Sequence, residues 1–377
     1  MKLTRPVHLR AASCPVATGQ CPNTHMRIIE IGCVPPPFGG VSVHLQRLLL
    51  HLKQRGIPHL LFDISGVSKS ADNVICTRWR HAVVRLLREP RAIVHFHNFS
   101  PRNLIVYWLI GLKHITILSL HNERFVDELD NIAASVRRIL VKMLNRLDVI
   151  FVSSEKCSQI LAPLIKDQDK IIVCPEFIAP TIPDNSVLPE EIVSLRRQHK
   201  YLISSNAFEI RFHQGKDLYG IDLLIELVAN LTHEESLDVA LVFLLPSIGD
   251  RAYFTKLKTR IEELEIAESF LFVTKPVVDA NAVWRISDLV IRATNTDGSS
   301  LTVKEALWCG TPVIASDCAP REPAAVLFKT RDLADLKAQV VAVLTASELY
   351  KASAKNVQLA NGVELLIDIY ERFTRGN

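Results

Sequence analysis

The stretch DGSSLTVKEALWCGTPVIASD, residues Asp297–Asp317, combines two acids, a helix pattern and a strand pattern. The small polar turn at 298–300 precedes apolar residues at helical spacing, and residues 309–312 (CGTP) are typical of a helix end. Free N–H groups and the positive end of a helix dipole therefore meet at this turn, which suits an anion such as a diphosphate. Asp297 precedes the helix and Glu305 lies on it, so the two acids can flank such a ligand. An N-cap followed by an ordinary amphipathic helix fits the same spacing equally well.

Composition indicates a globular protein with a charge asymmetry. The 377 residues are 48% hydrophobic and 22% charged, which predicts two or three domains of about 150 residues each. Residues 1–183 hold 23 Lys and Arg against 13 Asp and Glu, whereas the remainder holds 21 against 27. A basic first half suits an anionic partner, such as a membrane surface, a phosphorylated acceptor or nucleic acid. Uneven surface solvation explains the same asymmetry without a partner.

The cysteines and the N-terminal residues bear on compartment and metal binding. The eight cysteines follow no disulfide framework, and four of them lie in or beside apolar runs, which indicates a reducing compartment. Cys14, Cys21 and His25 lack the ligand pairing and the fourth partner of a zinc site, so we expect no metal. Residues 1–25 are expected to be a loose extension without a signal-peptide core. The longest apolar run, Leu104–Leu112, is too short to span a membrane.

A glycine loop follows the first predicted strand. Arg27–Cys33 is typical of a buried parallel strand, and the proline-rich turn after it ends at Gly39 and Gly40, where a helix pattern begins. The two glycines allow a ligand to approach the backbone closely. They do not form the Gly-x-Gly-x-x-Gly signature, so a nicotinamide cofactor is not indicated. A tight turn without a ligand is the alternative.

Polar side chains follow two further predicted strands of this half. His97 and Asn98 end one strand, and His121 ends another. Ligands of parallel α/β sheets bind outside the carboxyl ends of the strands, so these positions favour a site. Before the first of these strands, the helix pattern Trp79–Arg88 carries a basic face that fits either a membrane surface or plain solvation.

The alternation of strands and helices predicts two doubly wound α/β domains that face each other across a cleft. We predict a loose extension over 1–25, an N-terminal acceptor-side domain over 26–176 and a proline-rich linker over 177–200. A C-terminal nucleotide-sugar domain over 201–355 and a final helical segment over 356–377, packed back on the N-terminal domain, complete the prediction.

Over about residues 26–375, these features resemble the retaining family 4 (group 1) glycosyltransferases of GT-B fold. The acid-x7-acid spacing and the ending CGTPVIASD carry the most specific part of this resemblance. The resemblance implies that Glu305 bonds the ribose of a nucleotide sugar, that Asp297 contacts sugar hydroxyls and that His121 lies near the transferred sugar. It also implies that Gly39 and Gly40 form the phosphate loop on the acceptor side. The implied diphosphate-binding backbone is Gly298, Ser299, Ser300, Leu301 and Thr302.

The chain departs from this family pattern at two places. The first acid is usually glutamate, and Asp297 is one methylene shorter. Asn206 and Ala207 stand where a Gly-Arg pair is usual, so Arg211 and Lys216 are the nearest candidate cations for the leaving diphosphate. The form of residues 206–226 resembles a branch found in bacterial surface-polysaccharide clusters.

The expected function is therefore metal-independent transfer of a hexose from a UDP- or GDP-sugar, without a cofactor, to a glycan or polyprenyl-linked acceptor. A cytoplasmic location is expected, with peripheral contact to an anionic inner membrane face as an option. A non-catalytic nucleotide-sugar-binding or assembly subunit is the alternative. A phosphorylase or epimerase of GT-B fold fits less well, and no basic stretch interleaved with aromatic residues indicates nucleic acid.

Overall fold

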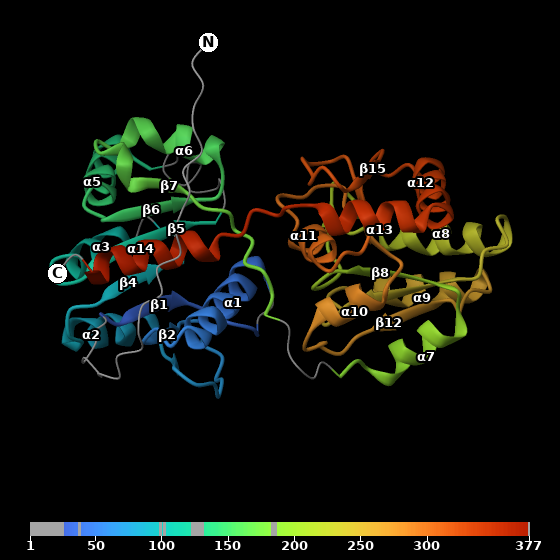
Figure 1. Cartoon of the computed structure of the whole chain (residues 1–377), viewed down its shortest axis with the longest axis horizontal. Helices are drawn as coiled ribbons and strands as arrows, with labels where there is room; N and C mark the ends of the chain where they lie inside the picture. The colour runs from blue at the N-terminus through green and yellow to red at the C-terminus, as the bar shows by residue number, and fades with distance from the viewer. Residues whose placement is uncertain are drawn as a thin grey trace, which may run out of the picture.

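The chain folds into two α/β lobes that are joined by two crossings (Figure 1). The computed structural model describes residues 26–36, 39–97, 100, 103–121, 132–181 and 187–375. The first crossing follows the last strand of the N-terminal lobe, and the second leads into the final helix, α14 (Val363–Arg375), which lies on the N-terminal lobe.

Seven parallel strands form the N-terminal sheet in the order β3-β2-β1-β4-β5-β6-β7. Most of these strands read as continuous apolar runs because helices cover both faces of the sheet. The strands are β1 Ile28–Gly32, β2 His59–Asp63, β3 Val74–Cys76, β4 Ile93–Phe96, β5 Ile115–Leu120, β6 Val149–Val152 and β7 Ile171–Val173. The helices are α1 Gly40–Gln54, α2 Trp79–Arg88, α3 Leu104–Ile110, α5 Ala134–Leu144 and α6 Glu155–Leu161, with 3-10 turns at Ala162–Leu164 and Gln168–Lys170.

Six parallel strands form the C-terminal sheet in the order β12-β11-β8-β13-β14-β15. The strands are β8 Tyr201–Asn206, β11 Val239–Leu244, β12 Phe270–Val273, β13 Leu289–Arg292, β14 Val313–Ser316 and β15 Val326–Phe328, and a separate hairpin pairs β9 Phe212–His213 with β10 Lys216–Asp217. The helices are α7 Glu190–Gln198, α8 Ile221–His233, α9 Arg251–Glu263, α10 Ala280–Ile286, α11 Leu301–Trp308, α12 Leu333–Thr345 and α13 Ser347–Asn356.

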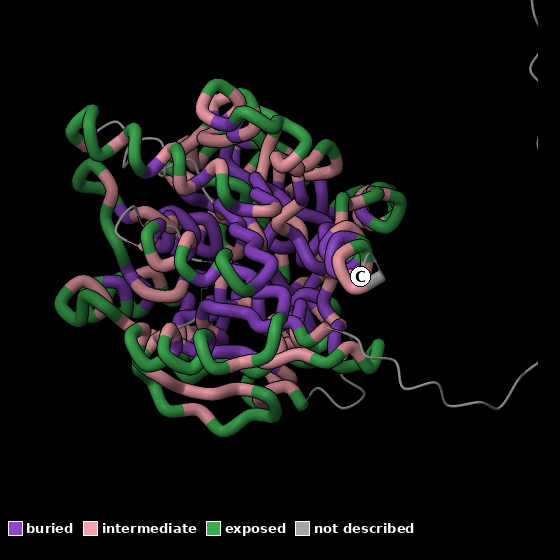
Figure 2. Tube along the Cα trace, turned by 90° about the vertical axis from the view of Figure 1, so that its left-hand side faces the viewer, coloured by how far each residue is buried: buried purple, intermediate pink, exposed green. Residues whose placement is uncertain are grey.

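Each sheet carries an apolar core on both of its faces, and the buried trace follows the strands (Figure 2). Helix α14 belongs to one of the N-terminal cores, where Leu366 and Tyr370 pack against residues of β1 and α1. The backbone at Gly362, just before α14, lies so close to the first crossing that a Cβ atom there would be 2.1 Å from the Pro175 carbonyl oxygen. The two crossings therefore pack directly against each other.

Strand order reverses direction once in each sheet, between β1 and β4 and between β8 and β13. Such switch points open a crevice at the carboxyl ends of the strands, where α/β proteins bind ligands. His97 follows β4 at the first switch point, and Asn206 and Arg292 end β8 and β13 at the second.

The predicted fold class is confirmed, but several short elements were missed. Helix α7 occupies residues 190–198, which the sequence analysis places in the linker, and its Ile192 and Leu195 pack in a core of the C-terminal lobe. The stretch 206–220, which holds Arg211 and Lys216, contains the β9–β10 hairpin. In the part of the chain that the structure describes, no helix is both long and apolar enough to cross a membrane.

Candidate functional site

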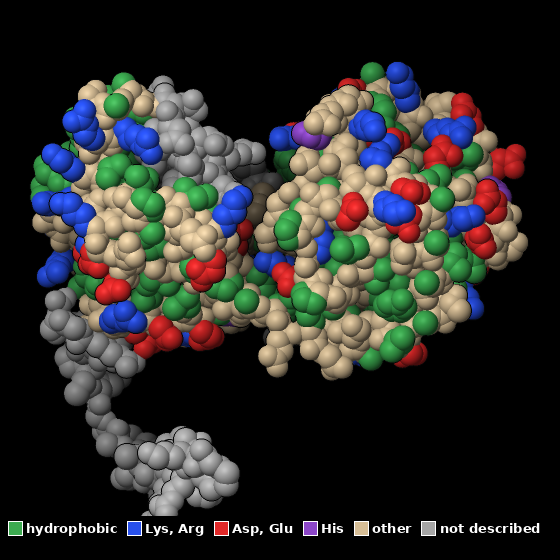
Figure 3. Space-filling model, turned by 90° about the horizontal axis from the view of Figure 1, so that it is seen from above, with side chains coloured by type: hydrophobic (Ala, Val, Ile, Leu, Met, Phe, Trp, Pro, Cys, Tyr) green, Lys and Arg blue, Asp and Glu red, His purple; other side chains and the backbone are tan. Residues whose placement is uncertain are grey.

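A cavity of about 350 Å³ lies between the two lobes (Figure 3). It is lined from the N-terminal lobe by the start of α1 and from the C-terminal lobe by the ends of β8 and β13 and the start of α11. Two helix N-termini therefore point at one cavity, which favours an anionic ligand. The residues predicted from the sequence that line it are Gly39, Gly40, Asn206, Asp297, Ser299, Ser300, Leu301, Thr302 and Glu305.

The start of α11 is fixed by two side-chain hydrogen bonds. The hydroxyl of Ser300 caps the helix by accepting from the Val303 N–H at 3.5 Å. The hydroxyl of Thr302 donates to Asn206 Oδ1 at 2.9 Å, which ties this helix to the end of β8. Gly298 precedes the cap, is exposed and does not line the cavity.

Asp297 is held by two arginines. Its carboxylate accepts from Arg292 Nε and from Arg321 Nη1, both at 3.0 Å, and from the Thr294 hydroxyl at 3.2 Å. Burial opposes ionisation of Asp297, but the charge and hydrogen bonds of Arg292, followed by those of Arg321, hold its pKa below the usual range. Asp297 is therefore an ionised carboxylate, and the two arginines that bond it carry more charge than it neutralises.

Glu305 forms an ion pair across the two lobes. One of its oxygens accepts from Arg47 of α1, and the other accepts from Trp284 Nε1 at 3.3 Å. Both charged residues are buried, with 7% exposure each. Arg47 also donates to the Ile178 carbonyl at 3.2 Å, so α1, the first crossing and α11 meet at this pair.

The two cations expected to face the diphosphate lie elsewhere. Arg211 is exposed and pairs with Glu209 at 2.6 Å, and Lys216 is exposed on β10, so the hairpin turns both away from the cavity lining. Lys275 and Arg292 line the cavity instead. Sequence reasoning missed Arg292, although it ends a parallel strand. The rule that ligands bind at the carboxyl ends of such strands is the one that pointed to His97 and His121.

A second cavity of about 100 Å³ adjoins the first and is lined by His44, His121, Glu176 and Lys304. It shares Gly40, Ser299 and Leu301 with the first cavity. Burial raises the pKa of Glu176 to about 7, although the charge of Lys304 opposes this shift. His44 Nε2 and Glu176 Oε1 are buried here without a hydrogen-bond partner among the described residues.

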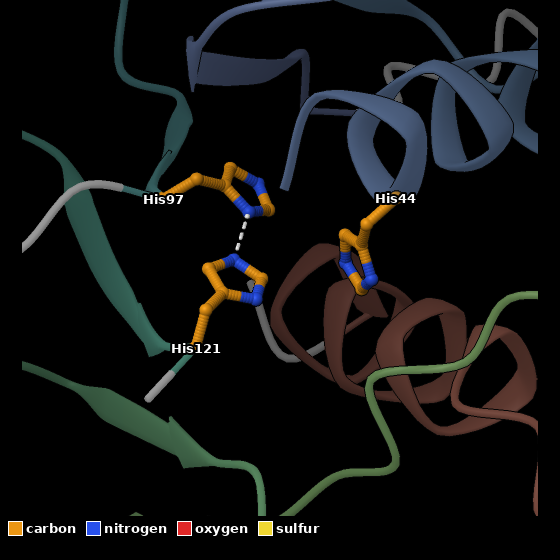
Figure 4. A group of neighbouring side chains, drawn as sticks. All are labelled: His44, His97 and His121. Atoms are coloured by element: carbon orange, nitrogen blue, oxygen red, sulfur yellow. Dashed lines mark hydrogen bonds between the residues drawn. The ribbon is translucent and has the colours of Figure 1, made fainter. Parts of the chain in front are cut away.

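Three histidines lie close together beside this second cavity, and two of them, His44 and His121, line it (Figure 4). His97 and His121 approach from the ends of β4 and β5 with 3.1 Å between His97 Nδ1 and His121 Nε2, and His44 faces them from α1. Burial, with repulsion between the rings, lowers the pKa of His44 and His97 to about 4 and that of His121 well below its usual value. All three rings are therefore neutral at pH 7. Asn98, which was predicted beside His97, lies outside the described residues.

Two groups of side chains have a spacing that suits a metal ion. His44, His97 and His121 form one group, and Glu30, His95 and His97 form the other, with one ligand atom per residue within 4.8 Å of the others. In the second group both Glu30 oxygens and both nitrogens of each histidine are hydrogen-bonded to neighbouring side chains. The expectation that the protein uses no metal stays a prediction.

The fold and the site define a two-domain protein of the GT-B type, and comparisons with known proteins agree with this class. Residues 211–359 match the family described as glycosyl transferases group 1. This match supports the group 1 part of the predicted resemblance over residues 211–359, whereas family 4 membership and retention stay predictions.

The individual relatives show how far the similarity extends. An alpha-monoglucosyldiacylglycerol synthase of Streptococcus pneumoniae is 25% identical over 239 residues, which are 59% of this chain, and the match spans about half (51%) of that protein. The Anabaena protein HepE, crystallised with UDP and with UDP-glucose, superposes with a TM-score of 0.61 at 15% identity, covering 93% of this chain and 100% of HepE. A glycosyltransferase of Rickettsia africae superposes with a TM-score of 0.63 at 15% identity, over 94% of this chain and 100% of that protein. At these identities the structural likeness establishes the fold.

Proposed function

We propose that this chain is a retaining glycosyltransferase that moves a hexose from a UDP- or GDP-sugar to a glycan or polyprenyl-linked saccharide. Its proposed setting is the biosynthesis of bacterial surface polysaccharide. One observation carries this proposal: the cavity between the lobes brings the start of α11, the carboxylates of Asp297 and Glu305, and Arg292 to one place. The group 1 family match over residues 211–359 and the UDP-glucose bound by HepE support a nucleotide-sugar donor.

The chemistry follows from the charges that develop during the reaction. Breaking the bond between a sugar and a diphosphate builds negative charge on the departing diphosphate. Preorganised donors aimed at that charge stabilise the transition state, and one such donor contributes about 3 kcal/mol, or roughly 100-fold in rate. The N–H groups at the start of α11 and the guanidinium of Arg292, which line the cavity, are the donors that we assign to this charge. Arg292 thus takes the role first expected of Arg211 and Lys216.

The remaining residues are assigned by their position in the two cavities. Glu305 is proposed to receive the ribose hydroxyls, while His121 in the second cavity faces the transferred sugar. Gly40 belongs to both cavities, and a Cβ atom there would meet nothing within 4 Å, so the loop leaves open space for the substrate. Retention would follow from attack on the same face of the sugar, with the acceptor proton passing to the leaving phosphate. A metal is not required in this scheme.

Two measurements test the proposal. A thermal-shift panel of UDP, GDP and ADP sugars should reveal the donor, because a ligand at a hundred times its Kd stabilises the folded state by about 2.7 kcal/mol. Transfer or hydrolysis of the radiolabelled donor should then be lost in Glu305→Ala. Full turnover of that variant would contradict the site assignment.

A matched pair of arginine variants tests the assigned cation. Arg292→Met should lower kcat about 100-fold, whereas Arg211→Met, which removes an exposed cation outside the cavity, should leave kcat within about twofold. Equal losses in the two variants, or a loss confined to Arg211→Met, would restore the original expectation. Far-UV circular dichroism of both variants checks that each is folded.

A non-catalytic nucleotide-sugar-binding or assembly subunit remains a second candidate. The observation in its favour is that both acids are already engaged, Asp297 by two arginines and Glu305 by Arg47. Such a subunit would be stabilised by a nucleotide sugar yet show no transfer or hydrolysis with any acceptor. Measurable turnover would exclude it.

We further propose a peripheral position at the inner face of the cytoplasmic membrane. Helices α2, α3 and α5 pack side by side on one face of the N-terminal sheet. These helices and the turn after α3 expose seven of the fourteen large hydrophobic side chains found exposed among the described residues: Val84, Leu87, Ile105, Leu109, Leu112, Val136 and Ile139. Exposed cations accompany them, and Figure 3 shows Lys and Arg gathered with hydrophobic side chains on the outer side of this lobe. Aliphatic and basic groups on one face suit an anionic bilayer surface.

Vesicle binding tests this surface. Replacing Arg80, Arg85 and Arg88 of α2 with glutamate should abolish co-sedimentation with vesicles containing phosphatidylglycerol. The matched control reverses three exposed cations of α9 in the other lobe, Arg251, Lys256 and Lys258, and should leave binding intact. Unaltered binding of the α2 variant would refute the proposed membrane contact.

A further inference from the structure

A group of polar side chains is buried in the N-terminal lobe between the sheet, α1 and α14. Glu30 of β1 and His95 of β4 are paired in the sheet register, and both are completely buried. Strand alternation places them on the face of the sheet that α14 covers, where Tyr370 reaches both of them. Buried polar groups of this kind are stable only when their hydrogen bonds are made. The arrangement of those bonds therefore carries information about which atoms hold protons.

The carboxylate of Glu30 sets the direction of the hydrogen bonds. Burial would raise its pKa, but the attraction and hydrogen bonds of His95 and His97 hold that pKa well below its usual value. An ionised carboxylate only accepts hydrogen bonds. Tyr370 therefore donates its hydroxyl proton to Glu30 Oε1 at 2.9 Å, and His97 Nε2 donates to Glu30 Oε2 at 2.8 Å.

The next link leads from His97 to the second cavity. Because His97 is neutral and carries its proton on Nε2, its Nδ1 has a free lone pair. The contact of 3.1 Å between His97 Nδ1 and His121 Nε2 then requires His121 to donate from Nε2. A neutral His121 that is protonated on Nε2 is unprotonated on Nδ1, and this nitrogen lies 3.9 Å from Glu176 Oε1 on the wall of the second cavity.

We infer that Glu30 and His97 are positioning residues that fix His121 in its Nε2-protonated form and present the Nδ1 lone pair to the second cavity. There it would accept a hydrogen bond from a hydroxyl group of the bound sugar or of its acceptor. This role rests on the proposed function, whereas the protonation pattern of the three side chains does not. Glu30 and His97 line neither of the two cavities described above and act through His121.

A bound divalent cation is the competing explanation for neighbouring histidines. His44, His97 and His121 could each offer one nitrogen to an ion. The hydrogen-bond geometry favours the relay, because the 3.1 Å contact between His97 and His121 is completed by a proton. His44 bonds the Glu176 carbonyl oxygen through Nδ1 at 2.7 Å and keeps Nε2 for an ion, but a cation held by all three rings would have to displace the bond between His97 and His121.

Nuclear magnetic resonance of the full chain labelled with 15N-histidine tests the relay directly. Among the ring signals of the thirteen histidines, those that are missing from the spectrum of His121→Asn are assigned to His121. At pH 7 the wild-type ring should be protonated on Nε2 and bare on Nδ1, and this measurement needs neither a substrate nor a variant of Glu30 or His97. A ring protonated on Nδ1, or a doubly protonated ring, would overturn the inference.

A matched pair of variants separates positioning from general damage to the cluster. Glu30→Gln should give a mixture of His121 tautomers and lower kcat at least about tenfold, in line with the loss of one charge-assisted hydrogen bond. Tyr370→Phe breaks another bond to the same carboxylate but leaves the Glu30–His97 bond, so the His121 tautomer and kcat should stay near wild type. Equal effects of the two variants on the tautomer would reduce the cluster to a structural role.

Metal analysis and the donor assay complete the test. Elemental analysis of the purified protein should find less than about 0.1 equivalents of zinc, and added Zn²⁺ should leave the His121 signal in place. Stoichiometric zinc bound at His121 would overturn the relay. If no nucleotide sugar is turned over, the proposed function fails, while the tautomer measurement still decides the relay on its own.

Discussion

Replacing Arg47 with methionine is expected to lower the free energy of unfolding by about 3–5 kcal/mol. That is the range for removing one partner of a buried ion pair, because the remaining charge is left uncompensated. The Arg47 and Glu305 side chains are only 8% and 9% exposed, so solvent cannot replace the lost guanidinium without a rearrangement of the lobes. The variant also leaves the Ile178 carbonyl without its Arg47 donor.

Urea unfolding followed by tryptophan fluorescence and by far-UV circular dichroism measures this effect. Trp284 is fully buried and donates to Glu305, so its emission reports on this region. The double variant Arg47→Met/Glu305→Gln should recover most of the loss, since no buried charge then remains and glutamine can still accept from Trp284. Its coupling energy should exceed about 2 kcal/mol.

An exposed ion pair serves as the control for this prediction. Arg260 pairs with Glu226 at 2.7 Å, but the two side chains are 45% and 34% exposed. Arg260→Met should therefore leave the free energy of unfolding close to that of the wild type. If Arg47→Met lowered the free energy of unfolding no more than Arg260→Met does, the reasoning would be refuted, because water would then reach Glu305 in the folded protein.

Three further outcomes follow from local geometry. Gly220→Ala should destabilise the C-terminal lobe by on the order of 3 kcal/mol, because φ is +67° and the new Cβ would lie 2.5 Å from the Ala293 carbonyl oxygen. The control Gly215→Ala has a similar φ of +73° but open space around it, and should cost only about 1 kcal/mol. The pKa of Glu176 is raised from 4.5 to about 7, so its ionisation destabilises the folded protein as pH rises through that window. The stability of Glu176→Gln relative to wild type should therefore increase by up to about 3 kcal/mol between pH 4 and pH 8. A difference in urea titrations that stays constant with pH would contradict this. Tyr370→Phe should lower stability by about 1–3 kcal/mol, because it strips one partner from each of two buried groups, and an unchanged Tm would show that water replaces the hydroxyl.

The parts of the site that could be predicted from the sequence are those set by local chemistry. The helix that begins after Ser300 was visible because its cap, its apolar spacing and its glycine end lie within a few residues of one another. The rule that ligands bind at strand ends located His97 and His121, and the same rule applied to β13 would have found Arg292. The linker prediction failed at α7 because four prolines just before it dominated the composition.

Other features depend on contacts that no local pattern contains. Arg47 and Glu305 are 258 positions apart, and nothing near either residue identifies the other as its partner. The raised pKa of Glu176 likewise comes from burial where the first crossing meets both lobes. Charge and closeness in sequence favour Arg211 and Lys216 as cations for the diphosphate. Their orientation depends on the β9–β10 hairpin, whose strands have two residues each.

The shorter acid at position 297 can be understood together with its arginines. An ionised carboxylate beside the start of α11 would repel a diphosphate, and a glutamate there would extend further into the cavity. Asp297 is instead drawn back onto Arg292 and Arg321, so this corner carries one net positive charge. Arg292 and Asp297 both line the cavity whereas Arg321 does not, so Arg321 offsets the charge of Asp297 from outside the lining and the positive charge of Arg292 is not cancelled. The departure from the family pattern at Asp297 and the cation that sequence reasoning missed are thus two parts of one arrangement, and changing Asp297 should alter diphosphate affinity through Arg292.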